Sequence, residues 1–349
     1  MSPVRHLEVP SAVRIALAPV SLVVALAVAA CGTSASPTPP ASASVQSGAP
    51  VALTVGLGYL ASVQFAQFYL ADRAGYYRDA GLNVTLQNEN DPNLIMLVGQ
   101  GAIDIGIGDG TSIIPAVSQG IPVVYTATVY GRFPSIVVAG TSSGIKSAAD
   151  LRGRKIGIPG KYGSSWIQLQ ALLGSVGLTP ADVTIVLYPE YSQAIALQQG
   201  VVDAATGYSN NEPVMLELQG FHTVVLTVDA IVPLPGPGLV TGVATLAAKH
   251  DALAAFTSAT LRAMNEIAAD PQQGLDATFA AVPDLAKDPT LQRAILDATI
   301  ATWKSPTAGA AFGTIDSASW QKSLDYLTTL GLVHNKVTVD HLVNTSLLP

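Results

Sequence analysis

Cysteine, charge and long apolar segments are all scarce in this chain of 349 residues. Cys31 is the only cysteine, so no intramolecular disulfide can form, and a chain of this length can bury an adequate core without one. Only 12% of the residues are charged, the net charge is −7, and the basic residues form no cluster. This balance excludes a nucleic-acid partner, whose binding depends on Lys and Arg neutralising phosphates.

The one long apolar run lies near the N-terminus, from Ile15 to Ala30, with Arg5 and Arg14 before it. A basic segment, an apolar segment and small residues at the end are typical of a secretory signal. A helix that crosses a membrane and ends in a buried cysteine is the alternative, but such a helix needs about 20 apolar residues. We therefore predict a signal peptide over residues 1–31.

The end of this signal has a further feature. Val28-Ala29-Ala30-Cys31 resembles the bacterial lipobox, in which the cysteine becomes the acylated first residue of a lipoprotein. Residues 32–50 are uncharged and rich in Ser, Pro and Ala, so they predict a flexible tether. The resemblance implies that Cys31 is lipidated and that the remaining chain is extracytoplasmic, lipid-anchored to the bacterial cell membrane.

From Val51 onward, short apolar runs alternate with helical segments, a rhythm that predicts a mostly parallel α/β sheet with helices on both faces. The length favours two domains. Gln100–Gly108 and Gln199–Gly207 both read Gln-Gly-apolar-apolar-Asp-x-x-x-Gly, in the same context of a helix before and a strand after. This internal repeat favours two related lobes, followed by helices broken at prolines 271, 283, 289 and 306.

Three segments in order resemble one known family: Gly75–Val84 (GYYRDAGLNV), Gly99–Gly106 (GQGAIDIG) and Asp150–Gly157 (DLRGRKIG). They are similar to motifs of the solute-binding proteins of the nitrate/sulfonate/taurine and thiamine-pyrimidine-precursor (NMT/THI-like) type. The resemblance implies a type II periplasmic-binding-protein fold, in which two crossover strands join two α/β lobes around a ligand cleft. It also implies the permease and ATPase of an ABC importer as partners.

We place the predicted crossovers near Ala139–Thr141 and Leu239–Gly242. Lobe 1 then comprises residues 51–141 and 240–349, and lobe 2 comprises residues 142–239.

Ligands of open α/β sheets bind beyond the carboxyl ends of the strands, and that rule selects the candidate site. Tyrosines recur at these ends, where a flat ring with a hydroxyl suits a planar ligand. Two serines open a predicted helix whose backbone N–H groups could hold an anion, and two carboxylates and an asparagine could bind amino groups. Packing or helix capping is the alternative for each. The predicted ligand-binding residues are Tyr59, Asp109, Tyr130, Tyr162, Ser164, Ser165, Tyr208, Asn210 and Glu212.

The charges of the candidate site residues indicate the class of ligand. Among the candidate positions only Lys161 is basic, although Arg132 is close in sequence. Two carboxylates and several tyrosines therefore favour a neutral or amino-bearing heterocycle, such as a thiamine pyrimidine precursor or a flavin-like vitamin. A sulfonate, taurine or nitrate ligand is the second possibility.

Other classes of protein fit less well. Pyrimidine synthases resemble this family but carry a cysteine-rich motif, and no cysteine follows Cys31. Gly56-x-Gly58-x-x-Ala61 imitates a dinucleotide fingerprint only loosely. The mature histidines are scattered without metal-binding spacing, so we expect no metal, no cofactor and no catalysis. We predict a monomer that feeds a transporter, with a sensor kinase as the alternative partner.

Overall fold

The computed structural model describes residues 49–88, 93–228 and 231–349. The predicted signal peptide, Cys31 and all but the last two residues of the predicted tether (32–50) lie outside these ranges. Among the described residues, no helix has both the length and the apolar character needed to cross a membrane.

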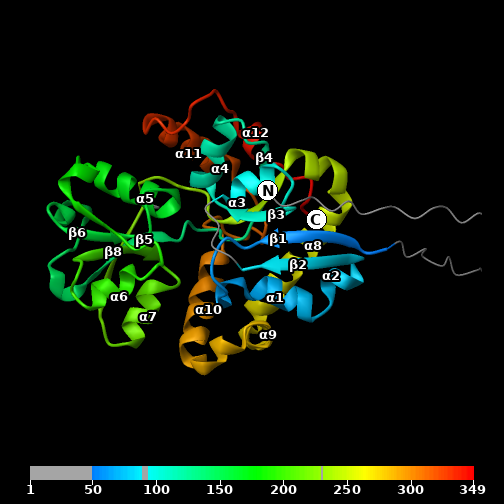
Figure 1. Cartoon of the computed structure of the whole chain (residues 1–349), viewed down its shortest axis with the longest axis horizontal. Coiled ribbons are helices and arrows are strands. Elements are labelled where there is room, and N and C mark those ends of the chain that lie inside the picture. Colours follow the sequence, from blue (N-terminus) through cyan, green and yellow to red (C-terminus); the bar gives the residue numbers. More distant parts are fainter. Residues whose placement is uncertain (1–48, 89–92, 229–230) are drawn as a thin grey trace, which may run out of the picture. The chain divides into compact units, whose positions relative to one another are not determined.

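Two five-stranded sheets organise the described residues (Figure 1). In the first sheet the order is β2-β1-β3-β10-β4, and in the second it is β7-β6-β8-β5-β9. The strands are β1 (Val51–Gly56), β2 (Leu82–Gln87), β3 (Ile105–Gly108), β4 (Val123–Thr128), β5 (Ser135–Gly140), β6 (Lys155–Ile158), β7 (Thr184–Leu187), β8 (Ala204–Tyr208), β9 (Thr223–Thr227) and β10 (Gly238–Gly242). Both predicted α/β lobes are therefore present.

One strand of each sheet runs against its neighbours. β10 is antiparallel to β3 and β4, and β5 is antiparallel to β8 and β9, whereas the β1, β2 and β3 pairings and the β6, β7 and β8 pairings are parallel. Each reversed strand is the first one that the chain forms after passing from the other sheet. The sheets are thus mixed, where the sequence predicts mostly parallel ones.

The chain leaves the first sheet after Thr128 and forms its first strand of the second sheet at Ser135. This change comes before the crossover predicted near Ala139–Thr141. The physical reason is burial, because all six residues of β5 are buried and the strand lies between β8 and β9 inside the second sheet. The predicted first lobe, residues 51–141, therefore includes one strand of the second sheet. The return occurs between Thr227 of β9 and Gly238 of β10, so it also comes before the crossover predicted near Leu239–Gly242.

Helices cover both faces of each sheet, as the alternation predicts. In the second sheet, Leu169 and Leu172 of α5 pack on one face, and Leu197 of α6 and Leu216 of α7 pack on the other (Figure 1). α1 and α8 lie in one core cluster of the first sheet, and α3, α4 and α11 lie in another. The helices are α1 (Ala66–Arg73), α2 (Tyr76–Asp79), α3 (Leu94–Gly99), α4 (Gly110–Ser118), α5 (Gly163–Gly174), α6 (Gln193–Gln198), α7 (Glu212–Leu218), α8 (Val243–Ala269), α9 (Pro271–Ala281), α10 (Pro289–Trp303), α11 (Ser317–Thr329) and α12 (Val339–Leu342).

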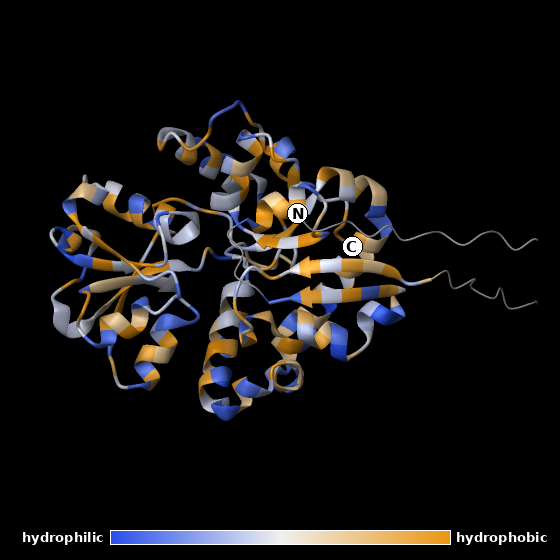
Figure 2. Cartoon of the chain, in the orientation of Figure 1, coloured by the Kyte–Doolittle hydropathy of each residue, from blue (hydrophilic) through white to orange (hydrophobic). Residues whose placement is uncertain are grey.

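Hydropathy follows these layers. Figure 2 shows apolar residues along strands of both sheets and hydrophilic residues on the outer turns of the helices. The apolar run Leu239–Leu246 reads as one strand in the sequence, but β10 ends at Gly242 because α8 begins at Val243. Pro271 and Pro289 occupy the first turns of α9 and α10, where a missing N–H costs no helical hydrogen bond, so these predicted breaks are confirmed.

Candidate functional site

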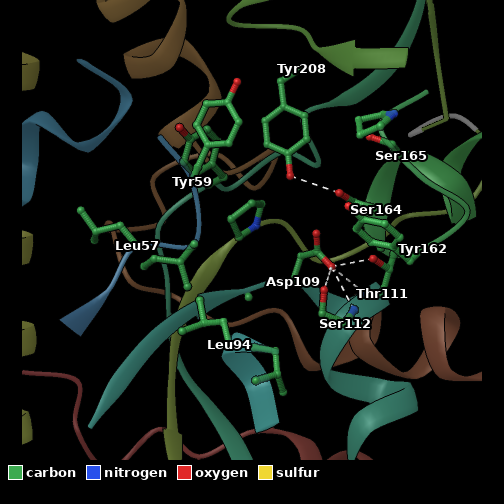
Figure 3. Close-up of a pocket in the computed structure, with 18 of the residues that line it drawn as sticks. Leu57, Tyr59, Leu94, Asp109, Thr111, Ser112, Tyr162, Ser164, Ser165 and Tyr208 are labelled. Carbon is green, nitrogen blue, oxygen red and sulfur yellow. Dashed lines mark hydrogen bonds between the residues drawn. The ribbon is translucent and has the colours of Figure 1, made fainter. Parts of the chain in front are cut away.

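A cavity of about 750 Å³ lies at the carboxyl ends of strands from both sheets (Figure 3). Its walls include the loops after β1, β3, β6, β7 and β8. Eight of the nine predicted ligand-binding residues line it: Tyr59, Asp109, Tyr130, Tyr162, Ser164, Ser165, Tyr208 and Glu212. The strand ends therefore bring residues separated by about 150 positions in the sequence into one cavity.

Asp109 caps the N-terminus of α4. Its Oδ1 accepts hydrogen bonds from the backbone N–H groups of Thr111 (2.9 Å) and Ser112 (3.1 Å) and from both side-chain hydroxyls (2.6 and 3.2 Å) (Figure 3). Asp109 is buried, and the loss of solvation raises the pKa of its carboxyl. All of these bonds go to Oδ1, so Oδ2 can accept a hydrogen bond from a molecule in the cavity.

Glu212 is the second buried carboxylate of the cavity and the first residue of α7. Its Oε2 accepts the backbone N–H of Tyr208 at 2.6 Å, which ties the start of the helix to the end of β8. Burial raises the pKa of Glu212. A Cβ at Gly207 would lie 2.7 Å from Oε2, so glycine at that position makes room for the carboxylate.

Tyrosines form much of the remaining wall. The hydroxyl of Tyr208 lies 3.1 Å from Ser164 Oγ, a hydrogen bond that connects the end of β8 with the start of α5 (Figure 3). Tyr130 is buried, whereas Tyr162 is 51% exposed at the cavity mouth. Burial raises the pKa of Tyr59, Tyr130 and Tyr208, so all three hydroxyls are neutral and can donate hydrogen bonds at physiological pH.

The N-terminus of α5 also faces the cavity. Gly163, Ser164 and Ser165 all line it, and no side chain caps the helix. Capping, the alternative role for Ser164 and Ser165, does not occur, because Tyr162 occupies the cap position and Ser164 bonds with Tyr208 instead. The first backbone N–H groups of α5 remain available to a polar ligand.

Asn210 does not line the cavity. It is fully buried, and its Nδ2 donates to Gln64 Oε1 at 2.9 Å and to Thr299 Oγ1 at 2.8 Å. Gln64 follows β1 and Thr299 belongs to α10, so these bonds join the loop after β8 to elements of the first lobe. The structure therefore places Asn210 away from the cavity wall with its Nδ2 group used inside the protein, and the ligand contact predicted for Asn210 stays a prediction.

Tyr191 lines the cavity but is missing from the predicted residues. It lies in the loop between β7 and α6, and its ring meets that of Tyr59 edge to face, at 5.2 Å between centroids and 85° between planes. Its φ of 62° is the only positive value at a non-glycine residue in the described ranges. Such a backbone costs about 1–2 kcal/mol, and an aromatic pair contributes about 0.5–1.5 kcal/mol. The rule that found the other loops would have found this one had it been applied to β7.

The cavity wall includes no Lys, Arg, His or Cys among the described residues. Apolar side chains such as Leu57, Leu94 and Ile107 complete it. The site therefore combines flat aromatic surfaces, neutral hydroxyl donors and two buried carboxyl groups, an arrangement suited to a planar, uncharged ligand that donates hydrogen bonds.

Comparison with known proteins agrees with this geometry. The family model described as "NMT1/THI5 like" matches residues 62–274. The chain belongs to this family. It is 30% identical over 339 residues to the riboflavin-binding protein RibY of Chloroflexus aurantiacus, covering 94% of this chain and 96% of that protein.

More distant relatives have other names. A 4-amino-5-hydroxymethyl-2-methylpyrimidine phosphate synthase of Legionella pneumophila is 26% identical, and the match covers 52% of this chain and 57% of that protein. The periplasmic aliphatic sulphonate binding protein SsuA of Escherichia coli has a TM-score of 0.67 at 19% identity, with 84% of this chain and 97% of that chain covered. The two-lobed periplasmic-binding-protein fold of this NMT1/THI5-like protein is thus confirmed.

Proposed function

We propose that this NMT1/THI5-like protein is the extracytoplasmic binding component of an ABC importer, and that its solute is riboflavin or a closely related flavin. The protein holds the solute between its two lobes and performs no chemical reaction on it. Family membership and the similarity to a riboflavin-binding protein along almost the entire chain support this function.

The observation that carries the choice of ligand is the set of tyrosines that line one cavity from both lobes. Tyr59 lies in the loop after β1, and Tyr130 lies in the segment that connects β4 of the first lobe to β5 of the second. The second lobe contributes Tyr162, Tyr191 and Tyr208. A flavin offers a broad planar ring that stacks on such side chains. Its ring N–H and its ribityl hydroxyls are hydrogen-bond donors, which suit the buried carboxyl groups of Asp109 and Glu212.

Size separates riboflavin from the smaller members of the same class. Binding pockets for ligands of drug size occupy about 300–1,000 Å³, and this cavity has about 750 Å³. A single aminopyrimidine ring would leave most of that volume to water. The proposed function therefore favours the three-ring flavin over a thiamine pyrimidine precursor.

The test is a titration of the purified protein with riboflavin, in which binding is measured by quenching of flavin fluorescence and by calorimetry. We expect a 1:1 complex of micromolar or tighter affinity, a melting point that rises with riboflavin concentration, and much weaker binding of hydroxymethyl-aminopyrimidine and of an alkanesulfonate. Tighter binding of either of those compounds would refute the flavin assignment.

Two variants locate the site. Tyr208→Ala and Glu212→Ala should each weaken riboflavin binding, because both side chains line the cavity. Tyr326→Ala is the matched control, since Tyr326 is a tyrosine that does not line the cavity. Equal affinities in all three variants would place the riboflavin site elsewhere.

The sulfonate alternative has one observation in its favour, the uncapped N-terminus of α5 at the cavity wall. Because no cation lines the described cavity, a sulfonate would depend on those N–H groups and the helix dipole alone. The alkanesulfonate arm of the titration tests this second candidate directly.

Lipid anchoring through Cys31 is part of the proposal and has a separate test. In membranes of cells that express the full chain, Cys31→Ala should release the protein into the soluble fraction. Retention of the variant in the membrane fraction would show that another segment anchors it.

The role in an ABC importer has its own test. If the protein serves an importer, cells that lack it should take up less riboflavin.

A further inference from the structure

The loop between β7 and α6, residues 188–192, contains Tyr191, a cavity residue with a left-handed backbone. Its turn is closed by the N–H of Tyr191, which donates to the carbonyl of Tyr188 at 2.9 Å, with Pro189 at the second position of the turn. Pro favours that position because its φ is already fixed. The turn delivers the chain into α6 through one residue with left-handed backbone, and that residue is Tyr191.

Glycine is the usual residue for such a backbone, since it has no Cβ. A bulky aromatic residue there is unfavourable, and strained residues of this kind cluster at ligand sites. Tyr191 belongs to none of the hydrophobic core clusters of the described residues, whereas Tyr59 packs against the main cluster of the first lobe. Core packing therefore does not explain why a tyrosine occupies this position.

The geometry of the two rings assigns them different roles. Because the Tyr59 and Tyr191 rings are 85° apart, one planar ligand cannot lie parallel to both. Tyr59 is partly buried and packs against the core of the first lobe. We therefore assign the face of the ligand ring to Tyr191, which also lines the cavity. We propose that Tyr191 is the principal stacking residue for the flavin ring and that Tyr59 meets the edge of the same ring. This inference rests on the proposed function and specifies which residue selects a planar solute.

The test compares three substitutions in the full-length protein with riboflavin as the probe. Tyr191→Phe keeps the ring and should bind within about threefold of the parent. Tyr191→Ala and Tyr191→Gly both remove the ring and should weaken binding by at least about tenfold. Tyr191→Gly also removes the backbone strain, so it should melt at a higher temperature than Tyr191→Ala.

Tyr188→Ala is the control for disturbance of the loop, because Tyr188 lies in the same turn but does not line the cavity. We expect it to retain riboflavin binding and the quenching of bound flavin, both of which Tyr191→Gly should reduce. If Tyr191→Gly binds riboflavin as the parent does, or if Tyr188→Ala loses as much affinity, the stacking role is wrong while the proposed function stands. A parent protein that does not bind riboflavin would refute both.

Discussion

Asn210 offers the sharpest test of how the two lobes are connected, because its side chain is buried and joins elements of both. Asn210→Ala removes the Nδ2 group that donates to Gln64 and Thr299. Gln64 Oε1 then loses the donor that reaches it from Asn210, a loss that costs about 1–3 kcal/mol for a buried group. The loss of the bond to Thr299 costs less free energy, because the Thr299 hydroxyl still donates to the carbonyl of Ile295 at 2.7 Å.

One contribution opposes this loss. Asn210 Oδ1 is itself buried and has no hydrogen-bond partner among the described residues, so its removal relieves part of the cost. We therefore expect the free energy of unfolding to fall by about 2 kcal/mol. For a protein of this size the melting temperature should drop by roughly 2–4 °C. The measurement is thermal unfolding followed by circular dichroism.

Two further variants make the result specific. Asn83→Ala removes an exposed asparagine of β2 and should change the stability by less than about 0.5 kcal/mol. Asn210→Asp places an acceptor where the donor was, facing Gln64 Oε1, and should be more destabilising than Asn210→Ala. If Asn210→Ala unfolds at the same temperature as the parent, the bonds to Gln64 and Thr299 do not stabilise the protein as we infer.

Three other predictions concern the cavity wall. Asp109→Ala should destabilise the protein by about 1–2 kcal/mol in a denaturant titration, whereas Asp109→Asn should cost less, since an amide oxygen can still cap α4; equal losses would contradict the capping role. Burial raises the folded pKa of Glu212 above its usual 4.5, so its contribution to stability is complete below that value and is lost as the pH rises through the folded pKa. The melting temperature of the parent relative to Glu212→Gln should therefore fall as the pH rises above 4.5, and a constant difference would count against a buried carboxyl. Gly207→Ala should weaken riboflavin binding by about tenfold through its clash with the Glu212 carboxylate, whereas Gly174→Ala, where a Cβ meets nothing, should leave binding unchanged.

The elements that sequence predicts best are those whose local signals agree. The apolar runs Val51–Leu57 and Leu82–Gln87 predict strands, and β1 and β2 match them to within one residue. Pro271 and Pro289 mark helix starts. Residues 62–79 read as one helix in the sequence, but the helical segment is divided at Gly75, whose φ of 80° separates α1 from α2. Gly75 is also part of a family motif, but nothing in its local sequence requires a positive φ.

Sheet membership is harder to predict because it depends on distant pairing. β5 reads as one more apolar strand after β4, and only its antiparallel pairing with β8 and β9 assigns it to the second sheet. The hydrogen-bond partner of Asn210 is equally hard to predict. Its position in the loop after β8 suggests a ligand contact, and only the folded position of α10 shows that Asn210 donates to Thr299. In each case a neighbour far away in the sequence decides the outcome.

Capping and ligand binding are usually treated as competing explanations for a polar residue at a strand end, but at Asp109 they are compatible. Four hydrogen bonds from Thr111 and Ser112 converge on Oδ1, and they hold the carboxyl group in one orientation at the start of α4. A side chain fixed in this way loses little further rotamer entropy when a ligand donates to Oδ2. Glu212 follows the same principle, since the backbone N–H of Tyr208 holds Oε2. Under the proposed function, the bonds that make both carboxylates part of the fold also hold them in position for the donor groups of the solute.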